Sequence, residues 1–336
     1  MFKMDLSVFP QVNLCHCPTP LEPLERLSKI LGGPEIWIKR DDCTGLSTGG
    51  NKARKLEFLV GDALNKGADT LVTQGAVQSN HARQTAAAAA KFGLKCHIIL
   101  ERRIPDTHEA YEITGNVFLN KLLGATIEYR ESGLDMNAEG KAVSRKLSEF
   151  GSKPYFIPGG GSNSVGALGY VNCAMELISQ FKTKSIQFDY LIHATGSTGT
   201  QAGLVSGLEG LDSGLPVLGI SVRQNSEKQI DAVWKLVKET SEILKIKDIQ
   251  REKILVDDRY VGKGYAIPTD GTIEAITLLA QTEGILLDPV YSGKGMAGLI
   301  DMVRNGDFKK GEKILFLHTG GSAALFAYEQ ELINYS

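Results

Sequence analysis

The chain has 336 residues, of which 42% are hydrophobic, and its 37 basic and 39 acidic side chains give a formal net charge of −2. This length exceeds the roughly 250–300 residues at which a single hydrophobic core stops growing, so two domains or one large α/β unit are expected. The near-neutral charge, without any run of like charges, argues against nucleic acid as a partner.

The predicted elements alternate along the chain between short apolar strands and longer segments of helical period. Strands are expected at residues 36–38, 70–73, 96–100, 126–129, 155–157, 190–193, 217–222 and 314–317. Helices are expected over residues 52–66, 79–91, 164–180 and 226–244. Continuous apolar strands that are each followed by a helix predict parallel sheets buried on both faces, and therefore an α/β protein. The glycine-rich stretch 158–162 is the expected crossing between two domains.

The cysteines and the apolar runs indicate the compartment. Five cysteines are spread over the chain without a CxxC pair or a histidine cluster at zinc spacing, which predicts a reduced, cytoplasmic protein without a structural metal. The N-terminal segment 1–10 lacks the apolar stretch of a signal peptide, and the other apolar runs fall short of the ~20 residues that cross a bilayer. The sequence therefore predicts a soluble protein that is not exported and has no membrane partner.

Lys52 is the first candidate for chemistry, because it begins a helix directly after Gly49, Gly50 and Asn51. A Walker A motif is not supported, since Asn51 stands where that motif needs lysine and Ala53 follows Lys52 in place of Ser or Thr. A lysine whose pKa is lowered by burial or by a neighbouring cation forms a Schiff base with a carbonyl compound. The alternative is an ordinary surface lysine after a flexible turn.

Two polar loops follow predicted strands, at the edge of a parallel sheet where ligands bind. The first, residues 75–81, contains Ser79 and Asn80, either of which could instead cap the helix that follows. The second, residues 196–200, places glycines around hydroxyl side chains at a helix N-terminus and suits a phosphate dianion. A dinucleotide is disfavoured, because the next strand continues into Arg223 and not into an acidic residue. A purely structural turn is the alternative for the second loop.

Three further loops carry hydroxyl groups to the sheet edges. Tyr265 follows a glycine, Tyr291 lies in the glycine-rich segment 289–295, and Thr319 follows the last predicted strand. Simple packing is the alternative for each tyrosine. Together with Lys52 and the phosphate loop, these groups are expected to converge on one site.

These segments resemble a known family. The strings TGGNKARKLE (48–57), QSNHARQTA (78–86), GSTGT (196–200), DPVYSGKG (288–295) and HTGG (318–321) are similar to those of the D-cysteine desulfhydrase and 1-aminocyclopropane-1-carboxylate deaminase family, within the tryptophan-synthase-β-like fold. The resemblance runs from about Phe9 to Tyr328. It implies two open, twisted, mostly parallel sheets flanked by helices, with pyridoxal 5′-phosphate in the cleft between two domains. The large domain would comprise residues 1–52 and 163–336 and the small domain residues 53–162, and the protein would be a homodimer.

The resemblance also implies roles for individual residues. Lys52 would bind the cofactor through a Schiff base, and Asn80 would hydrogen-bond the phenolic oxygen of the cofactor. Thr319 would face the pyridine nitrogen. Ser79, Tyr265 and Tyr291 would surround the substrate next to Asn80, bind its carboxylate and assist proton transfer. The residues that would hold the phosphate are Gly196, Ser197, Thr198, Gly199 and Thr200.

The expected reaction is an α,β-elimination on a small sulfur amino acid. The deaminases carry a glutamate after the loop tyrosine and a leucine before the last glycine pair, where this chain has Ser292 and Thr319. A carboxylate beside the pyridine nitrogen makes a stronger electron sink than hydroxyl groups do, and cyclopropane opening would require it. D-Cysteine desulfhydration to pyruvate, ammonia and hydrogen sulfide is therefore expected. The alternatives are an L-cysteate sulfo-lyase, which the string DDCTGLSTGG (41–50) also resembles, then a deaminase, and a non-catalytic pyridoxal-phosphate-binding protein.

Overall fold

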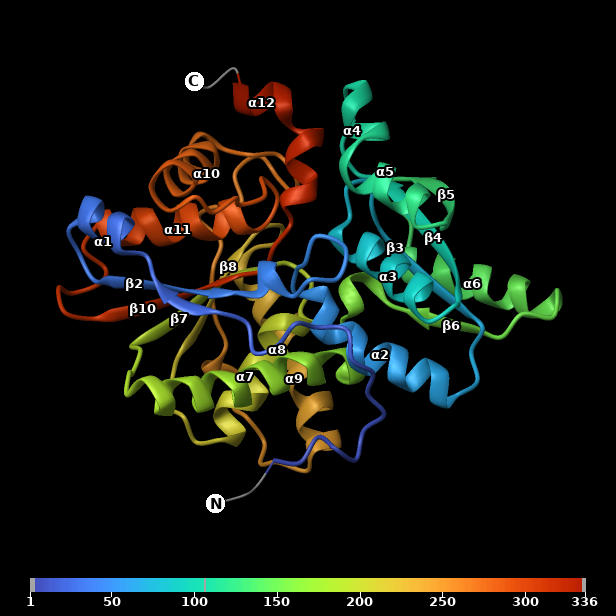
Figure 1. The fold of residues 1–336 in the computed structure, drawn as a ribbon, viewed down its shortest axis with the longest axis horizontal. Helices are drawn as coiled ribbons and strands as arrows, with labels where there is room; N and C mark the ends of the chain where they lie inside the picture. Colours follow the sequence, from blue (N-terminus) through green and yellow to red (C-terminus); the bar gives the residue numbers. More distant parts are fainter. Residues whose placement is uncertain (1–3, 106, 334–336) are drawn as a thin grey trace.

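The computed structural model describes residues 4–105 and 107–333 and contains two separate sheets (Figure 1). The larger sheet has the order β1-β2-β10-β7-β8-β9, and its strands are all parallel apart from the antiparallel edge strand β1. The smaller sheet has the order β5-β4-β3-β6 and is entirely parallel. The larger sheet is made of β1 (Leu21–Pro23), β2 (Glu35–Arg40), β7 (Tyr190–Thr195), β8 (Val217–Ser221), β9 (Leu255–Asp257) and β10 (Lys313–His318), and the smaller of β3 (Thr70–Ala76), β4 (Lys95–Arg102), β5 (Thr126–Glu131) and β6 (Pro154–Ile157).

Helices cover both faces of the larger sheet. One face packs against α7 (Ser164–Lys184), α8 (Gly199–Gly210) and α9 (Ser226–Leu244), and the other against α1 (Glu25–Leu31), α10 (Asp270–Glu283) and α11 (Ser292–Arg304). Strand β10 shows why its sequence is continuously apolar. Leu315 and Leu317 join the core on one face, while Ile314 and Phe316 join the core on the other. Successive side chains of a strand point to opposite faces, so a strand covered on both sides needs apolar residues throughout.

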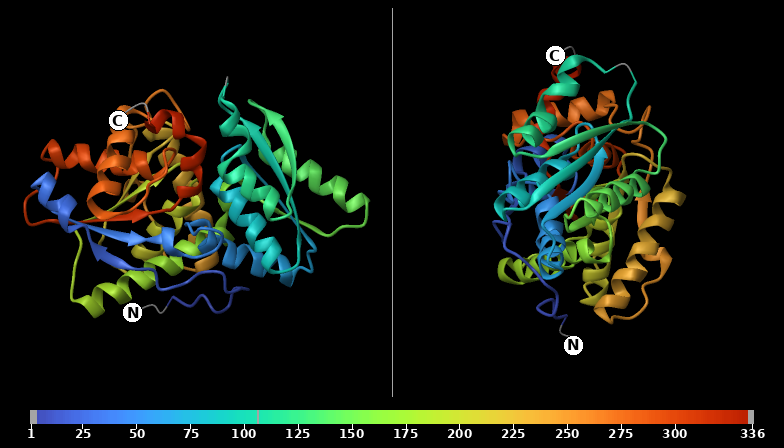
Figure 2. Two further views of the ribbon diagram at one scale, coloured as in Figure 1. Left: turned by 45° about the horizontal axis from the view of Figure 1, so that its top comes forward. Right: turned by 90° about the vertical axis from the view of Figure 1, so that its right-hand side faces the viewer.

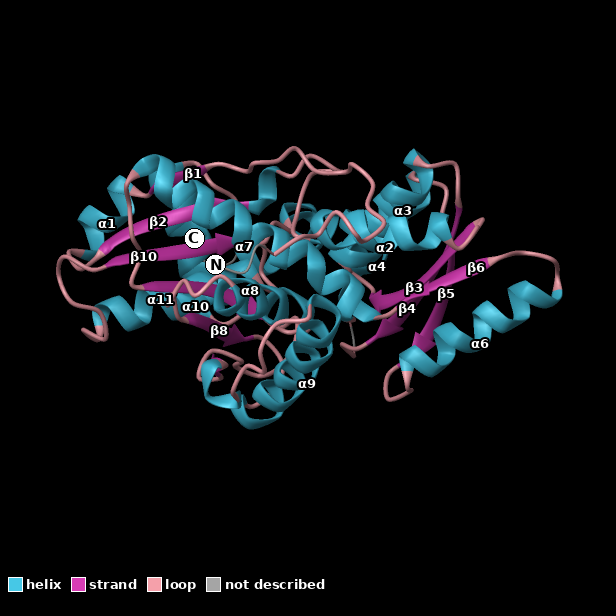
Figure 3. Ribbon diagram, turned by 90° about the horizontal axis from the view of Figure 1, so that it is seen from below, coloured by secondary structure: helices cyan, strands magenta, loops and turns pink. Residues whose placement is uncertain are grey.

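The smaller sheet is covered in the same way. Its strands pack on one face against α2 (Lys52–Asn65), α3 (Asn80–Lys91) and α5 (Gly115–Leu122), and on the other against α6 (Met136–Glu149) (Figure 3). Figure 2 shows the two sheets with their helices as two lobes side by side. The remaining elements are α4 (Glu109–Ile113), α12 (Glu329–Ile333), η1 (Asp41–Cys43), η2 (Gly159–Gly161), η3 (Arg251–Lys253) and η4 (Ser322–Ala327).

The sequence predictions for the fold are confirmed. Every predicted strand and helix is present, and α9 has the predicted bounds, whereas α7 continues to Lys184. The chain passes from β2 of the larger sheet to β3 of the smaller, and η2 follows β6 where the chain returns to α7. Within residues 4–105 and 107–333, no helix has the length and apolar character that crossing a membrane requires. Residues 1–3 of the N-terminal segment, on which the prediction about a signal peptide partly depends, lie outside the described residues.

Candidate active site

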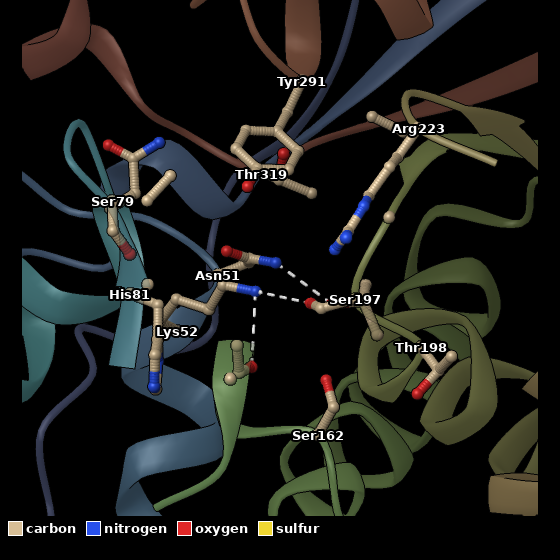
Figure 4. A pocket seen from close by; sticks show the side chains of 18 of the residues that line it. Asn51, Lys52, Ser79, His81, Ser162, Ser197, Thr198, Arg223, Tyr291 and Thr319 are labelled. Atoms are coloured by element: carbon tan, nitrogen blue, oxygen red, sulfur yellow. Dashed lines mark hydrogen bonds between the residues drawn. The ribbon is translucent and has the colours of Figure 1, made fainter. Parts of the chain in front are cut away.

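A cavity of about 320 Å³ lies between the two sheets (Figure 4). Its walls come from the segments that follow strands β3, β4 and β6 of the smaller sheet and β7, β8 and β10 of the larger sheet. The carboxyl ends of both parallel sheets therefore meet at one site, the position at which α/β proteins bind ligands. The cavity is lined by all but one of the sequence-predicted site residues, namely Lys52, Ser79, Asn80, Gly196, Ser197, Thr198, Thr200, Tyr265, Tyr291 and Thr319.

Gly199, the exception, lies beneath the floor of the cavity. Its backbone N–H donates to Ser162 Oγ at 3.1 Å, and Ser162 itself lines the cavity. A Cβ atom added to Gly199 would lie 2.9 Å from Lys55 Nζ and 3.0 Å from Ser162 Oγ. A larger residue here would displace the lysine amine, so glycine allows the first turn of α8 to approach Lys55 closely.

Lys52 is the first residue of α2, and its side chain enters the cavity. Its Nζ atom lies 3.2 Å from Ser197 Oγ and 3.4 Å from the carbonyl oxygen of Gly160 (Figure 4). Burial lowers the pKa of Lys52 to about 8. The turn before α2 depends on Gly49, whose φ is +74° and whose added Cβ would lie 1.8 Å from the carbonyl oxygen of Asp42. This turn directs Lys52 toward the loop 196–200, which follows β7.

Lys55 lies one helical turn after Lys52 and is fully buried. Its Nζ atom donates to the carbonyl oxygen of Gly160 at 3.1 Å. Burial and the neighbouring Lys52 both lower the pKa of Lys55 well below its usual value. Neither lysine forms a salt bridge with any residue that the structure describes. Two adjacent buried amines without a carboxylate partner favour the binding of an anion between them.

The N-terminus of α3 carries a second polar wall. Ser79 caps this helix, since its Oγ accepts the N–H of Ala82 at 3.1 Å, as the alternative interpretation of the sequence stated. Asn80 Oδ1 accepts hydrogen bonds from Arg83 Nη1 at 3.2 Å and from Asn116 Nδ2 at 2.9 Å. These two bonds occupy the oxygen of Asn80 and leave its amide N–H groups as donors. The side chain is therefore held ready to bind an acceptor atom of a ligand.

His81 also lines the cavity, although the sequence analysis assigned it no role. Its Nε2 atom lies 2.8 Å from Thr73 Oγ1, and its buried Nδ1 atom has no hydrogen-bond partner within residues 4–105 and 107–333. Burial, Lys52 and Lys55 lower the pKa of His81 well below its ordinary value, so the ring is neutral at pH 7. An unsatisfied buried nitrogen next to a cavity is a feature of sites that hold a polar ligand.

Tyr265 and Tyr291 form a hydroxyl pair at the cavity wall. Their Oη atoms are 2.5 Å apart, and their rings meet edge to face with centroids 5.9 Å apart. Burial and the neighbouring Tyr265 raise the pKa of Tyr291 well above its usual value. The Tyr265 loop is held by Tyr328, whose hydroxyl donates to the carbonyl oxygen of Ala266 at 2.9 Å. The pair can therefore pass a proton between its two oxygens at a fixed place in the cavity.

Lys294 stabilises the same loop from beneath. Its Nζ atom donates to the carbonyl oxygens of Val261 and Gly264, each at 2.7 Å, and it does not line the cavity. Burial lowers the pKa of Lys294 to about 8. Lys294 and Lys52 thus share a lowered pKa, but only Lys52 faces the cavity.

The expectation that Ser292 presents its hydroxyl beside the ligand is wrong. Ser292 is buried and is not among the residues that line the cavity. Its Oγ donates to Asp288 Oδ1 at 2.7 Å, and the same carboxylate accepts the N–H groups of Val290, Tyr291 and Ser292 at the start of α11. The serine belongs to a capping network. Ser292 and Thr319 are the two positions at which this chain was compared with the deaminases, and of these two residues only Thr319 lines the cavity.

Arg103 and Arg223 are cavity residues that the sequence analysis missed as ligands. Each lies just after a predicted strand, at the carboxyl ends of β4 and β8 respectively. Their position directly after predicted strands could have identified both arginines as cavity residues, although arginine side chains are mostly exposed to solvent. Asn137, another lining residue, lies in the first turn of α6, a helix that the sequence analysis did not predict.

Comparison with known proteins agrees with this geometry. A family model described as pyridoxal-phosphate-dependent enzyme matches residues 12–320. The chain belongs to this family. It is 46% identical over 330 residues to a D-cysteine desulfhydrase of Serratia proteamaculans (strain 568), with 98% of this chain and 99% of that protein covered. The resemblance stated from the sequence is thereby confirmed.

Solved structures of other proteins have the same fold. The crystal structure of an ACC deaminase homologue is 39% identical and superposes with a TM-score of 0.89, with 98% of each chain covered. A hydrogen sulfide-producing enzyme from Fusobacterium nucleatum is 17% identical, covers 91% of this chain and 95% of its own, and has a TM-score of 0.64, so it is similar in fold. The predicted fold class, two mostly parallel sheets flanked by helices, is confirmed by this family and by the strand order.

The cavity fits pyridoxal 5′-phosphate, the cofactor of the family. The cofactor combines an aldehyde, which a neutral amine attacks, with a phosphate dianion, which buried cations and backbone N–H groups bind. Lys52, whose pKa is lowered, and the N-terminus of α8 line the cavity. Lys55 lies directly behind it, since its Nζ donates to the carbonyl oxygen of the lining residue Gly160, and it has no carboxylate partner among the described residues. The predicted cofactor is therefore confirmed, and the chain is an enzyme that acts on small molecules.

Proposed function

We propose that the protein is a D-cysteine desulfhydrase, a carbon–sulfur lyase that converts D-cysteine and water to pyruvate, ammonia and hydrogen sulfide. The observation that carries this proposal is a cavity that Lys52 and the Tyr265–Tyr291 pair both line and that is suited to the cofactor and a small amino acid. The D-cysteine desulfhydrase that is 46% identical over nearly the full length supports the choice of substrate.

In this proposal, Lys52 carries the cofactor and a second group of residues holds its phosphate. Gly196, Ser197, Thr198, Gly199 and Thr200 would hold the phosphate at the N-terminus of α8, and Lys55 would provide the buried positive charge beneath them. Asn80 would donate to the phenolic oxygen, since its own oxygen is already occupied, and Thr319 would face the pyridine nitrogen. When bound, pyridoxal phosphate withdraws electrons from the Cα atom of the amino acid and so weakens the Cα–H bond.

The substrate would be oriented by the N-terminus of α3. Ser79 and Asn80 stand there, and the positive end of the helix dipole favours a carboxylate. Lys52 Nζ, with a pKa of about 8, is suited to accept the Cα proton at neutral pH. The hydroxyl pair is suited to donate a proton from Tyr265 or Tyr291 to the departing sulfur, so that the Cβ–S bond breaks with its electron pair on sulfur.

The function is tested by incubating the purified holoenzyme with D-cysteine, L-cysteine, L-cysteate and 1-aminocyclopropane-1-carboxylate. The expected result is pyruvate with an equal amount of sulfide from D-cysteine. Pyruvate with sulfite from L-cysteate only would replace the proposal with a sulfo-lyase, and 2-oxobutanoate from the cyclopropane would replace it with a deaminase. No keto acid from any of these substrates would indicate a protein that binds the cofactor without catalysis.

The assignment of Lys52 is tested by borohydride reduction of the holoenzyme followed by peptide mapping. Label is expected on Lys52. Lys294 is an internal control, because burial lowers its pKa to the same value of about 8 while its Nζ is bonded to loop carbonyls. Label on Lys294 would contradict the assignment.

We also propose that the enzyme is a cytoplasmic homodimer with a large domain, residues 1–52 and 163–336, and a small domain, residues 53–162. The free state of all five cysteines supports a reducing compartment, and the two sheets support the division into domains. Residues 1–3, 106 and 334–336 of these ranges lie outside the described part of the chain. Light scattering on the purified holoenzyme tests the dimer, and limited proteolysis near residues 44–50 and 158–163 tests the boundaries.

A further inference from the structure

The charge of the cavity exceeds what the proposed reaction requires. Three cationic side chains line it, those of Lys52, Arg103 and Arg223. Among the described residues that line the cavity, none is an aspartate or a glutamate. A cavity with this charge attracts anions in preference to cations.

Arg103 stands at the entrance, and part of its guanidinium has no partner among the described residues. It lines the main cavity and also an outer depression that it shares with Arg102 and Glu131. Its Nε atom donates to Glu101, and its guanidinium carbon lies 5.2 Å from the centroid of the Tyr265 ring. The terminal nitrogens, Nη1 and Nη2, have no acceptor within residues 4–105 and 107–333. The Glu101 contact and the Tyr265 ring hold the guanidinium in place, and its two terminal nitrogens keep their N–H groups unpaired among the described residues.

Arg223 approaches the cavity from the larger sheet. It follows β8, and its guanidinium extends toward the cavity near Tyr291 and Ser197 (Figure 4). Within the part of the chain that the structure describes, this guanidinium has no hydrogen bond and no salt bridge. Val222, the residue before Arg223, and Tyr291 both lie beside Gly196, since a Cβ added to this glycine would be 2.8 Å from Val222 Cγ2 and 3.5 Å from Tyr291 Cε1. Arg223 lies near Tyr291 on the side of the larger sheet (Figure 4), and Arg103 lies over the Tyr265 ring on the side of the smaller sheet.

The other expected anions have donors of their own. In the proposed function, on which this inference rests, residues 196–200 and Lys55 hold the cofactor phosphate. Ser79 and Asn80 hold the substrate carboxylate. The two arginines are left without an assigned partner, and they lie beside the hydroxyl pair that is proposed to protonate the leaving group. A neutral thiol on Cβ would not require two guanidinium groups there.

We propose that Arg103 and Arg223 form an anion subsite that recognises a tetrahedral oxyanion on the β carbon of the substrate. Guanidinium binds the paired oxygens of a sulfonate or a phosphate through parallel hydrogen bonds. The elimination balances without another reactant: the Cα proton is removed, the Cα=Cβ bond forms, and the Cβ–S bond of a sulfonate breaks with its electron pair on sulfur to release sulfite. For a phosphate ester the Cβ–O bond breaks with its pair on oxygen and phosphate departs.

The test compares substrates that differ only in the β group. Both enantiomers of cysteate and of O-phosphoserine are assayed for pyruvate beside D-cysteine, with sulfite and phosphate measured to distinguish the two oxyanions. The variants are Arg103→Gln, Arg223→Gln and the control Arg102→Gln. Arg102→Gln removes the same charge one residue away from Arg103. The Arg102 guanidinium lies over the Tyr129 ring, and Arg102 does not line the main cavity.

We expect the enzyme to cleave at least one of the oxyanion substrates. Arg103→Gln and Arg223→Gln should each lower kcat/KM for that substrate about tenfold or more beyond any effect on D-cysteine, because each removes a charged hydrogen bond to the leaving group. Arg102→Gln should leave both values unchanged. An equal loss for all substrates would place the arginines at the common carboxylate and would overturn the proposal. Cofactor absorbance of each variant shows whether the phosphate site is intact, and loss of cofactor from Arg223→Gln would overturn the role of that residue.

Binding gives a readout that does not depend on turnover. Calorimetric titration of the holoenzyme with 3-sulfopropanoate, which has both acidic groups but no amine, should show binding that Arg103→Gln weakens about tenfold. Propanoate, the control, should bind weakly to both proteins. The subsite fails if 3-sulfopropanoate binds no better than propanoate, even where D-cysteine is cleaved. The proposed function fails, and the subsite stands, if the analogue binds and D-cysteine is not a substrate.

Discussion

Lys52 and Lys55 show how single residues prepare the cavity for its cofactor. The two amines are one helical turn apart, and the pKa of each is lowered by burial. An ordinary lysine with a pKa near 10.5 is neutral in only about 0.03% of molecules at pH 7, whereas a pKa of about 8 makes about 10% neutral. Only the neutral amine attacks an aldehyde, so burial makes Lys52 reactive near neutral pH.

The rate at which the apoenzyme takes up pyridoxal phosphate should follow this titration. Because the pKa of Lys52 is lowered to about 8, the neutral fraction rises from pH 6, reaches about half at pH 8 and levels off above about pH 9. Stopped-flow absorbance of cofactor binding, measured from pH 6 to pH 10, checks the prediction. A rate that keeps rising to about pH 10.5 would show that the amine is not desolvated.

The hydroxyl pair gives a second prediction for single residues. Tyr265→Phe and Tyr291→Phe should each lower kcat about 100-fold, because either change removes one partner of the proton-donating pair. The double variant should lose little more than each single one, since the two hydroxyls act as a unit. Cofactor absorbance should be unchanged. Tyr260→Phe is the matched control, as its hydroxyl donates to Asp301 at 2.7 Å outside the cavity.

At the scale of elements, α8 presents its N-terminus to the cavity with an unused hydroxyl. Thr198 occupies the N-cap position, but its side chain makes no capping hydrogen bond and lines the cavity. The N–H of Gly199 donates to Ser162 Oγ, and the N–H groups of the next residues of the first turn are available to an anion. This differs from α3, where the side chain of Ser79 satisfies the N–H of Ala82.

Thr198→Asp should weaken pyridoxal phosphate binding without unfolding the protein. Two like charges about 4 Å apart repel by about 4 kcal/mol at an effective dielectric constant of 20. Equilibrium dialysis of the cofactor, with a circular dichroism spectrum of each protein, makes the measurement. Thr183→Asp, at an exposed position on α7, is the control and should bind the cofactor as the parent protein does. Unchanged affinity of Thr198→Asp would mean that the phosphate lies elsewhere.

The elements that the sequence predicted are those with strong local patterns. Strand β10 is apolar on both faces, and α9 has an unbroken helical period, so both could be identified without tertiary information. Strands β1 and β9 have three residues each, and Pro23 ends β1 at the sheet edge, so no periodicity could reveal them. The site loops were predictable because they follow strands. The burial of Ser292 against Asp288 was not, since it depends on how α11 begins.

At the scale of the whole molecule, one buried ionic network connects segments far apart in the sequence. Arg54 of α2 donates from Nε to Asp41 Oδ2 at 2.8 Å and from Nη1 to Glu176 Oε2 of α7 at 3.0 Å. Thr19 and Tyr170 donate to the same aspartate at 2.8 and 2.7 Å. Burial opposes ionisation of Asp41, but the charge of Arg54 outweighs it and lowers the pKa of the carboxyl. The network thus joins the N-terminal segment, α2 and α7 just behind Lys52.

Arg54→Met should lower the free energy of unfolding by about 3–5 kcal/mol at pH 7, because it leaves Asp41 buried without its partner. In the parent protein, the lowered pKa of Asp41 means that this stabilisation is present above the unfolded pKa near 4 and is lost as the pH falls through the folded pKa. Urea denaturation at pH 7 and at about pH 3, below the unfolded pKa of Asp41, measures both effects, and the difference between parent and variant should shrink at the lower pH. Arg145→Met, on the exposed face of α6, should change stability little.

The position of β10 determines when the protein can become functional during its synthesis. This strand lies between β2 and β7 in the larger sheet, yet it is the last strand of the chain. The strands of the smaller sheet are all present once residue 157 has been made, whereas the larger sheet keeps two unpaired strand edges until residue 318 emerges from the ribosome. Thr319, which lines the cavity, follows immediately. A chain truncated before β10 would therefore expose aggregation-prone edges and have no complete cofactor site.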